Sequence, residues 1–557
     1  MSRRVKRDAG SRSWAYVLVG VLLIVMASCG ACWLIYQAAQ RDVRGENTAT
    51  LEVAYSPEKQ SLFDELVKRF HASRPKTPSG KRVSIVTTAL EPEAMVQAAL
   101  EGRFQAICPD SSVWLSQLEL DWQAAAQSEL SIVGETTRFA LSPVVIAMWD
   151  STARSLGYPD KAIGWADILA LARGNPDFKW SHPSTSSASG LLATLATFYA
   201  GAGKTRGLTV EDATAEATLQ YVTALEKTVR YYGEGERAVI EQVQAKGRAY
   251  LDAFVVQEQL LIQFNQRSKD RLVAIYPVEG ALWADHPLVL LEREDTAAEQ
   301  RAAYRSFREF LLSRDAQMLV LASGYRPSEL DIALDSATSP IKVANGVDPT
   351  QPQTTLQIPS PAVVQVVRDV WQYTKRKTNL YLIADVSGSM QGQKLEQAKE
   401  ALITFLSMIK GTEERVGLIV FSSEVREAVS LETLGTQRAT LTEMITGLSA
   451  GGDTALLDAI NLAYDRLQQR QDAERINAIV VMTDGKENNS RIRLKDLTAR
   501  ILSRNQSGVP VVVFCVAYGS DADMDVLETI AAAAGGQARR GSPETIRELY
   551  KLLSTYF

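Results

Sequence analysis

Residues 379–390 read NLYLIADVSGSM, and they are the most informative stretch for the fold of the second half of the chain. Its first seven residues, 379–385, form an apolar run that is typical of a buried β-strand and ends in an acidic residue. A turn of small residues follows, and then LEQAKEALITFLSMI (395–409) shows helical spacing of its apolar residues. A buried strand, a turn and an amphipathic helix in this order are typical of a parallel sheet covered by helices on both faces.

The same alternation continues to the end of the sequence. Further apolar strands are expected at 414–421, 475–485 and 509–519, and helices at 454–468, 523–534 and 543–554. We therefore predict that 375–557 is a doubly wound, Rossmann-like α/β domain, called the second module below.

Oxygen-bearing side chains gather where these strands end. Asp385, Ser387 and Ser389 follow the first strand in a D-x-S-x-S pattern, whose turn brings the three side chains together. Thr454 and Asp484 stand at the mouths of two other connections of the same sheet. Carboxylates and hydroxyls are hard ligands that suit Mg²⁺. The pattern predicts a magnesium site with few charges, which leaves the ion able to accept an acid from a partner.

Three segments carry a family resemblance: DVSGSM (385–390), GGDTALLDAI (451–460) and VVMTDGKENN (480–489). They resemble the metal-ion-dependent adhesion site (MIDAS) of von Willebrand factor type A domains. The resemblance implies Mg²⁺, or Mn²⁺ or Ca²⁺, as the ion, and a protein partner that offers an acidic group to it. Asp453 adds a carboxylate next to this pattern, and we expect it to point outward.

The first half of the chain also alternates strands with helices, over 48–335. LEVAYS (51–56) and RVSIVTTAL (82–90) predict strands, and each is followed by a helical pattern. Such units form parallel sheets, which bind ligands at the carboxyl ends of their strands. Three turns rich in hydroxyls are expected there, and they supply the candidate ligand-binding residues Ser56, Ser111, Ser112, Thr185, Ser186, Ser187 and Ser189.

Two interpretations of these hydroxyls stay open. Short hydroxyls and backbone N–H groups at helix starts can form a neutral cradle for an anion or a sugar. Alternatively, Ser and Thr simply cap the helices. Because few charged residues occupy the turns, we expect an oxyanion or a polyol held by dipoles.

The first half resembles bacterial extracellular solute-binding proteins over about residues 50–330. The resemblance implies two α/β lobes that close on a small solute, and this unit is called the first module below. We expect lobe one to contain 50–140 and 266–330, and lobe two 141–265. A polar, proline-rich linker, 336–361, is expected to allow the modules some relative motion. The segments that carry the resemblance are 137–172, 182–200, 253–265 and 274–291.

The N-terminus predicts the compartment. Residues 1–13 are basic, and the uncharged run 14–36 would span about 34 Å as a helix, enough for a bilayer core of about 30 Å. Positive charge before the span predicts a single-pass protein of the bacterial cell membrane with a cytoplasmic basic tail and extracytoplasmic C-terminal modules. A lipoprotein signal is the alternative, because small residues precede Cys29.

Composition excludes several classes of function. The net charge is -5 over 557 residues, which argues against a generally basic nucleic-acid-binding protein. Only three histidines occur, and they are far apart, so neither a His-rich metal site nor a Ser-His-Asp set is indicated. We expect that the protein is not an enzyme.

The favoured hypothesis is a cell-surface binding protein that combines recognition of a small solute with metal-dependent adhesion to another protein. The alternative is the solute-binding component of an ABC-type uptake system, with the second module as a docking device. A third hypothesis is hydrolysis with the metal as Lewis acid. It would need a general base near Asp385, which the sequence does not clearly supply.

Overall fold

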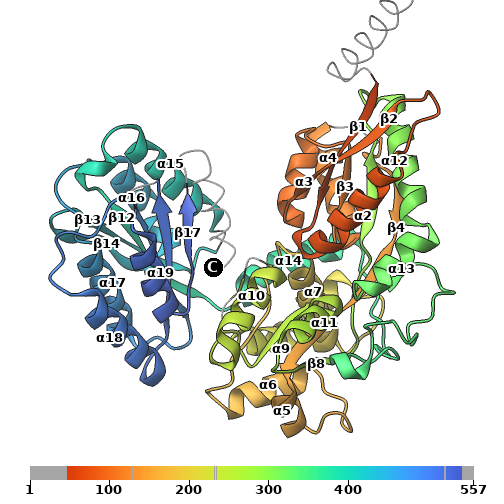
Figure 1. Cartoon of the computed structure of the whole chain (residues 1–557). Helices are drawn as coiled ribbons and strands as arrows, with labels where there is room; N and C mark the ends of the chain where they lie inside the picture. Colours follow the sequence, from red (N-terminus) through yellow and green to blue (C-terminus); the bar gives the residue numbers. More distant parts are fainter. Residues whose placement is uncertain are drawn as a thin grey trace, which may run out of the picture.

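The structure, a computed structural model, describes residues 47–126, 130–230, 232–233, 235–409, 411–519 and 522–541. Figure 1 shows two α/β bodies, with the first module in red to green and the second in teal to blue. The mixed α/β class predicted from the sequence is confirmed in both. The helix expected at 543–554 lies outside the described residues.

Lobe one is a five-stranded sheet in the order β2-β1-β3-β10-β4. The central strand β1 pairs in parallel with β2 and β3, whereas β10 runs antiparallel between β3 and β4. The strands are β1 (Thr48–Tyr55), β2 (Arg82–Ala89), β3 (Ala106–Cys108), β4 (Val133–Arg138) and β10 (Pro287–Leu291). The helices are η1 (Pro57–Lys59), α2 (Gln60–Ala72), α3 (Pro92–Leu100), α4 (Val113–Ala126), α12 (Ala298–Leu311) and α13 (Arg314–Ala322).

Lobe two is built around the long strand β5, and its sheet has the order β11-β5-β7-β6 with β8 and β9 also on β5. The strands are β5 (Ala140–Trp149), β6 (Trp180–Ser181), β7 (Ala253–Gln257), β8 (Leu272–Ile275), β9 (Trp283–Ala284) and β11 (Arg326–Pro327). The helices are α5 (Asp150–Ser155), α6 (Trp165–Gly174), α7 (Ala188–Ala202), α8 (Val210–Thr214), α9 (Glu216–Glu226), α10 (Glu236–Lys246), η2 (Gly247–Ala249) and α11 (Glu258–Arg267).

The chain returns to lobe one later than the sequence suggested. Return was expected at 266, but β8 pairs antiparallel with β5, from Ile146 opposite Ile275 to Trp149 opposite Leu272. All four residues of β8 are buried, so the apolar strand completes the core of lobe two. The return occurs only at β10.

The segment 336–361, expected as a linker, lies against lobe two instead of hanging free. The backbone N–H of Ala274 donates to the carbonyl of Gly346 at 2.8 Å, and that of Leu356 donates to Ala281 at 2.9 Å. Ile341 and Val347 are buried, and a short η3 (Val343–Asn345) lies between them. Its backbone bonds and buried apolar side chains make this segment part of the first module.

Helix α14 (Pro361–Thr374) continues that segment and contacts both lobes. Arg368 pairs with Glu93 of lobe one at 2.7 Å, and its guanidinium lies over the ring of Trp114. Trp371 packs edge-on against Tyr232 of lobe two, with ring centroids 5.1 Å apart. The helix therefore ties the two lobes together just before the chain enters the second module.

The second module has a six-stranded sheet in the order β14-β13-β12-β15-β16-β17. All neighbours are parallel except β14, which is an antiparallel edge strand. The strands are β12 (Thr378–Asp385), β13 (Arg415–Phe421), β14 (Val425–Thr433), β15 (Ile476–Thr483), β16 (Val511–Tyr518) and β17 (Ala538–Gly541). The helices are η4 (Gly388–Met390), α15 (Gln393–Met408), α16 (Leu434–Thr446), α17 (Leu456–Arg470), α18 (Leu494–Ser507) and α19 (Met524–Ala533).

The prediction of a single-pass membrane protein is corrected. Within the described residues, no helix is long and apolar enough to cross a membrane. The longest of them, α15, has 16 residues, so it spans about 24 Å against the about 30 Å of a bilayer core. The expected span 14–36 and the alternative lipid site at Cys29 both lie outside the described residues.

Candidate functional site

The five predicted metal ligands lie at the carboxyl ends of the strands in the second module. Asp385 ends β12, Ser387 and Ser389 lie at η4, Thr454 precedes α17, and Asp484 follows β15. Because β12 and β15 are parallel neighbours, their carboxyl ends meet at the same edge.

Hydrogen bonds join these side chains into one cluster. The hydroxyl of Ser389 donates to Oδ1 of Asp484 at 2.6 Å, and it lies 3.0 Å from the hydroxyl of Ser387. The backbone N–H of Ser387 donates to Oδ1 of Asp385 at 2.7 Å. A Cβ atom at Gly485 would lie 3.0 Å from Oγ1 of Thr454 and 3.4 Å from Oγ of Ser389. The structure thus brings all five predicted residues together.

The electrostatics of this cluster favour a cation. Asp385 and Asp484 are buried, at 1% and 0% exposure. Burial raises the pKa of Asp385, and the neighbouring Asp484 raises it further. A divalent ion between them would offset both charges, and the two serine hydroxyls are hard donors beside them. The residues present therefore fit a Mg²⁺ ion.

Two further charged residues, Lys394 and Asp453, lie close to this cluster. The ammonium of Lys394, in the first turn of α15, lies 2.5 Å from Oδ2 of Asp484. Sequence reasoning missed Lys394, although its position in the helix after the D-x-S-x-S turn was a usable signal. Asp453 is exposed, and its backbone N–H donates to Ser423 Oγ at 2.8 Å. The Asp453 carboxylate also lies 3.5 Å from that hydroxyl, so the expectation that it points outward is confirmed.

The predicted hydroxyls of the first module have different environments. Ser187 caps α7, because its hydroxyl accepts the N–H of Gly190 at 3.2 Å. Ser111 accepts the N–H of Val113 in the same manner at 3.3 Å. The N–H of Ser112 donates to Asp285 at 2.7 Å. Helix capping and local bonding therefore account for these three. Thr185 is buried and Ser186 half-buried in the turn before α7.

Ser56 and Ser189 are the two that reach a buried polar cluster. Both are fully buried, and neither hydroxyl makes a hydrogen bond of normal geometry. The Ser56 hydroxyl helps to lower the pKa of Asp110, and that of Ser189 helps to lower the pKa of Glu236. These two hydroxyls therefore face carboxylates, not helix ends.

Three carboxylates from both lobes form the centre of this cluster. One oxygen from each of Glu58, Asp110 and Glu236 lies within 4.8 Å of the others, and all three residues are buried. Glu58 lies in η1 and Asp110 follows β3, both in lobe one, whereas Glu236 begins α10 in lobe two. We call these three residues the interlobe acid cluster.

One lysine and one amide hold the interlobe acid cluster in place. The ammonium of Lys59 lies 3.0 Å from Oδ1 of Asp110 and donates to the carbonyl of Cys108 at 2.8 Å. The Gln257 amide donates to Asp110 at 2.8 Å and to Glu236 at 2.9 Å. Lys59 thus compensates Asp110, while Gln257 only orients the carboxylates.

The pKa values of the three carboxyl groups differ because only Asp110 pairs with the ammonium of Lys59. Burial raises the pKa of Glu58 well above its ordinary value, and Asp110, Glu91 and Glu236 add to the rise. Burial and Asp110 raise the pKa of Glu236 to about 7. Burial also acts to raise that of Asp110, but Lys59 and other neighbours outweigh it and keep the value low.

Sequence reasoning missed the interlobe acid cluster. It considered hydroxyls only and expected few charged side chains at these turns, which is wrong. Glu58 and Lys59 stand two and three residues after Ser56, and Asp110 stands next to Ser111. Those adjacent positions were the available signal.

Family models match two parts of the chain. Residues 51–326 match the bacterial extracellular solute-binding protein, and residues 379–548 match the von Willebrand factor type A domain. The chain joins an extracellular solute-binding domain to a von Willebrand factor type A domain. The first module is thus the solute-binding domain, extended by 336–374, and the second is the von Willebrand factor type A (VWA) domain.

Individual relatives match one domain each. Human inter-alpha-trypsin inhibitor heavy chain H4 is 30% identical over 182 residues, which are 30% of this chain and 18% of that protein. The chain therefore spans less than a fifth of that relative's length. The sulfate-binding protein SubI from Mycobacterium tuberculosis is 18% identical, covering 51% of this chain and 89% of its own, with a TM-score of 0.37. A von Willebrand factor type A protein from Catenulispora acidiphila is 22% identical, covering 32% and 43%, with a TM-score of 0.29.

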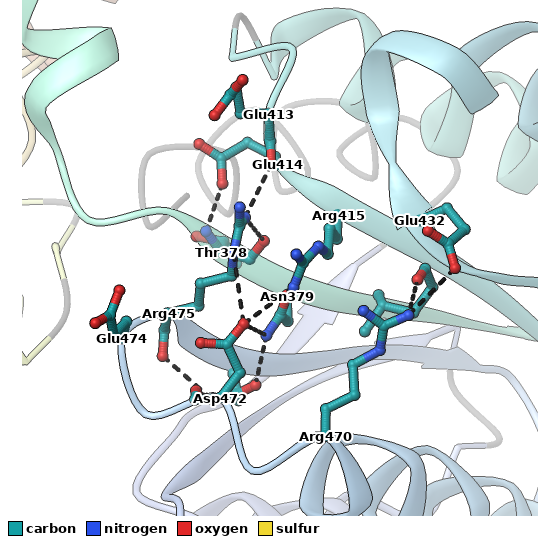
Figure 2. Close-up of polar contacts among 12 residues, drawn as sticks. Thr378, Asn379, Glu413, Glu414, Arg415, Glu432, Arg470, Asp472, Glu474 and Arg475 are labelled. Carbon is teal, nitrogen blue, oxygen red and sulfur yellow. Dashed lines mark hydrogen bonds and ion pairs between the residues drawn. The ribbon is translucent and has the colours of Figure 1, made fainter.

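The opposite, amino-end edge of the VWA sheet carries a charged network (Figure 2). Asp472 lies 3.0 Å from Nη1 of Arg415 and 3.6 Å from Nε of Arg475. Glu414 accepts the backbone N–H of Thr378 at the start of β12. Since β12 carries Thr378 at one end and Asp385 at the other, this network and the candidate ion site lie at opposite ends of the strands.

Arg376 joins this edge of the VWA domain to the solute-binding domain. Its backbone N–H donates to the hydroxyl of Tyr232 at 2.8 Å, and its guanidinium donates to the carbonyls of Val229 at 2.8 Å and Ala473 at 2.5 Å. The junction also borders a cavity of about 350 Å³ that Arg415, Asp472 and Arg475 help to line. The metal cluster faces away from this junction.

Proposed function

We propose that the chain is a two-part binding protein in which the VWA domain engages another protein through a divalent ion. Asp385, Ser387, Ser389, Thr454 and Asp484 hold Mg²⁺, with Mn²⁺ or Ca²⁺ as substitutes, and an acidic group of the partner completes the ion's coordination. The solute-binding domain closes its lobes on a small solute. We further propose that the protein acts by binding and not by catalysis.

One observation carries the adhesion part of the proposal. The Ser389 hydroxyl, lying 3.0 Å from that of Ser387, donates to Asp484 at 2.6 Å, so residues 95 positions apart already share one ligand cluster. Because this site has only two carboxylates, a bound ion stays electrophilic and can accept a third carboxylate from a partner protein. The cluster lies at the opposite end of the strands from Arg376, and Ser389 is exposed there, where a partner would approach.

The environments of His71 and His182 support binding over catalysis. His71 accepts the N–H of Ile85 at 2.9 Å. His182 lies between the carbonyl of Pro183 at 2.9 Å and the carboxylate of Glu226 at 3.2 Å. Both make structural contacts, and neither of these contacts is to a serine nucleophile.

Calorimetric titration of the full chain with Mg²⁺ tests the VWA site. Wild type and the matched control Asp453→Ala should bind one ion at this site, because the Asp453 carboxylate faces Ser423. Asp385→Ala should lose that binding while circular dichroism stays unchanged, since every residue of β12 is buried in the sheet. Equal Mg²⁺ binding by Asp385→Ala and wild type would overturn the proposed site.

A further inference from the structure

The interlobe acid cluster carries more negative charge than its own surroundings neutralise. Glu58, Asp110 and Glu236 are 5%, 0% and 1% exposed, and Glu91 adds a further negative charge beside Glu58. Among the described residues, the ammonium of Lys59 lies within this cluster, and it already pairs with Asp110. Buried carboxylates without counter-charges are costly, so this cluster is stabilised by taking up positive charge, either as protons or as a bound cation.

Within the described residues, several buried polar atoms around the cluster lack a hydrogen-bond partner of normal geometry. They are Oε2 of Glu58, the hydroxyls of Ser56 and Ser189, and both ring nitrogens of His286. The imidazole of His286 packs edge-on against Tyr325 at 5.1 Å, and its electrostatic neighbours are Lys59 and Asp110. Buried polar groups are rarely left without a hydrogen-bond partner in a folded interior. Here they are oxygen and imidazole nitrogen atoms, which are common ligands of metal ions.

The spacing suits a single ion. The three carboxylate oxygens lie within 4.8 Å of one another. Ligands on opposite sides of Ca²⁺ are separated by about 4.6–5.2 Å, twice its usual ligand distance of about 2.3–2.6 Å. The backbone also approaches the carboxylates closely here, because a Cβ at Gly235 would lie 2.9 Å from Oε1 of Glu91 and 3.1 Å from Oε1 of Glu58.

We infer that the solute captured by the solute-binding domain is a divalent metal cation, held between the lobes by Glu58, Asp110 and Glu236. Ser56 and Ser189 complete the oxygen set from lobe one and lobe two respectively. Because Glu236 comes from the opposite lobe to Glu58 and Asp110, the ion joins the lobes and favours their closed arrangement. This inference rests on the proposed function and names its cargo; it replaces the expected oxyanion or polyol.

The test measures the number of Mn²⁺ ions bound per full chain by equilibrium dialysis. It uses a mutant cycle of four proteins: wild type, a variant of each site, and the combined variant. Wild type should bind two ions and Asp385→Ala one, at the interlobe cluster. Glu58→Gln combined with Glu236→Gln should leave one, at the VWA site, and all three changes together should leave none. Glu241→Gln, on the same helix α10 but with a side chain 67% exposed, is the matched control and should bind two.

A smaller substitution provides a second test that disturbs the fold less. Ser189→Ala removes a single hydroxyl and should weaken Mn²⁺ binding to the Asp385→Ala chain several-fold. No Mn²⁺ bound by folded Asp385→Ala chain would overturn the cation assignment.

Thermal denaturation of the Asp385→Ala chain distinguishes this inference from the proposed function. Stabilisation by Mn²⁺ or Ca²⁺ supports it. Stabilisation by sulfate, a sugar or putrescine, with none by divalent ions, overturns the metal assignment but leaves solute capture standing. No stabilisation by any of these solutes overturns both.

Discussion

The ammonium of Lys394 lies 2.5 Å from Oδ2 of Asp484, inside the cluster that we propose as the ion site of the VWA domain. Asp484 is fully buried, whereas the Lys394 side chain is 37% exposed and can move away. A divalent ion and this ammonium would compete for the same carboxylate.

Lys394→Gln should therefore tighten Mg²⁺ binding several-fold, because the ion no longer displaces a positive charge. Calorimetric titration of wild type and variant in the same buffer measures the change. Lys486→Gln, at an exposed lysine two residues after Asp484, is the control. Weaker Mg²⁺ binding by Lys394→Gln would mean that the lysine supports the site instead of competing for it.

Arg376→Ala should loosen the junction between the domains. The change removes charge-assisted hydrogen bonds to the carbonyls of Val229 and Ala473, each worth about 1.5–3 kcal/mol when the donor is charged. Scanning calorimetry should show a lower first transition, or two transitions where wild type has one. Arg493→Ala, which removes an ion pair from an arginine 83% exposed, should change neither. An unchanged calorimetric profile for Arg376→Ala would contradict a role at the junction.

Arg368→Met should weaken the attachment of α14 to lobe one. The arginine pairs with Glu93 at 2.7 Å and lies 5.3 Å from the ring centre of Trp114. Losing a partly buried cation–π contact and its ion pair should cost about 1–2 kcal/mol. Thermal unfolding measures this, and Arg314→Met, which breaks an ion pair exposed on both sides, is the control. Equal stability of the two variants would argue against α14 as a tie between the lobes.

His71 should make stability depend on pH. Its Nε2 accepts the N–H of Ile85, and burial, helped by Arg82, lowers its pKa below 6.5. The folded protein thus binds this proton less readily than the unfolded chain, so the stabilisation is full above pH 6.5 and is lost as pH falls below it. Unfolding experiments from pH 7 to 5 should show a smaller loss of stability for His71→Gln than for wild type. A steeper loss for the variant would contradict this assignment.

The VWA metal cluster could be predicted from the sequence because its signals are local. Asp385, Ser387 and Ser389 follow a buried strand within five residues, and Thr454 and Asp484 stand at strand or helix ends of the same sheet. Parallel pairing of β12 and β15 then brings these ends together with no further information. Lys394 was missed: its position after the turn placed it near the site, but only the tertiary structure shows that its ammonium reaches Asp484.

Two α/β modules and the residues that we propose as ion ligands of the second could be predicted from the sequence, since apolar periodicity and strand-end turns are properties of neighbouring residues. The tertiary structure was needed to show that 336–374 belongs to the solute-binding domain and that Glu58, Asp110 and Glu236 meet. Those contacts join positions up to 178 residues apart across two lobes. Whether a carboxylate is buried beside another depends on how the lobes pack, and no local pattern in the chain encodes that packing.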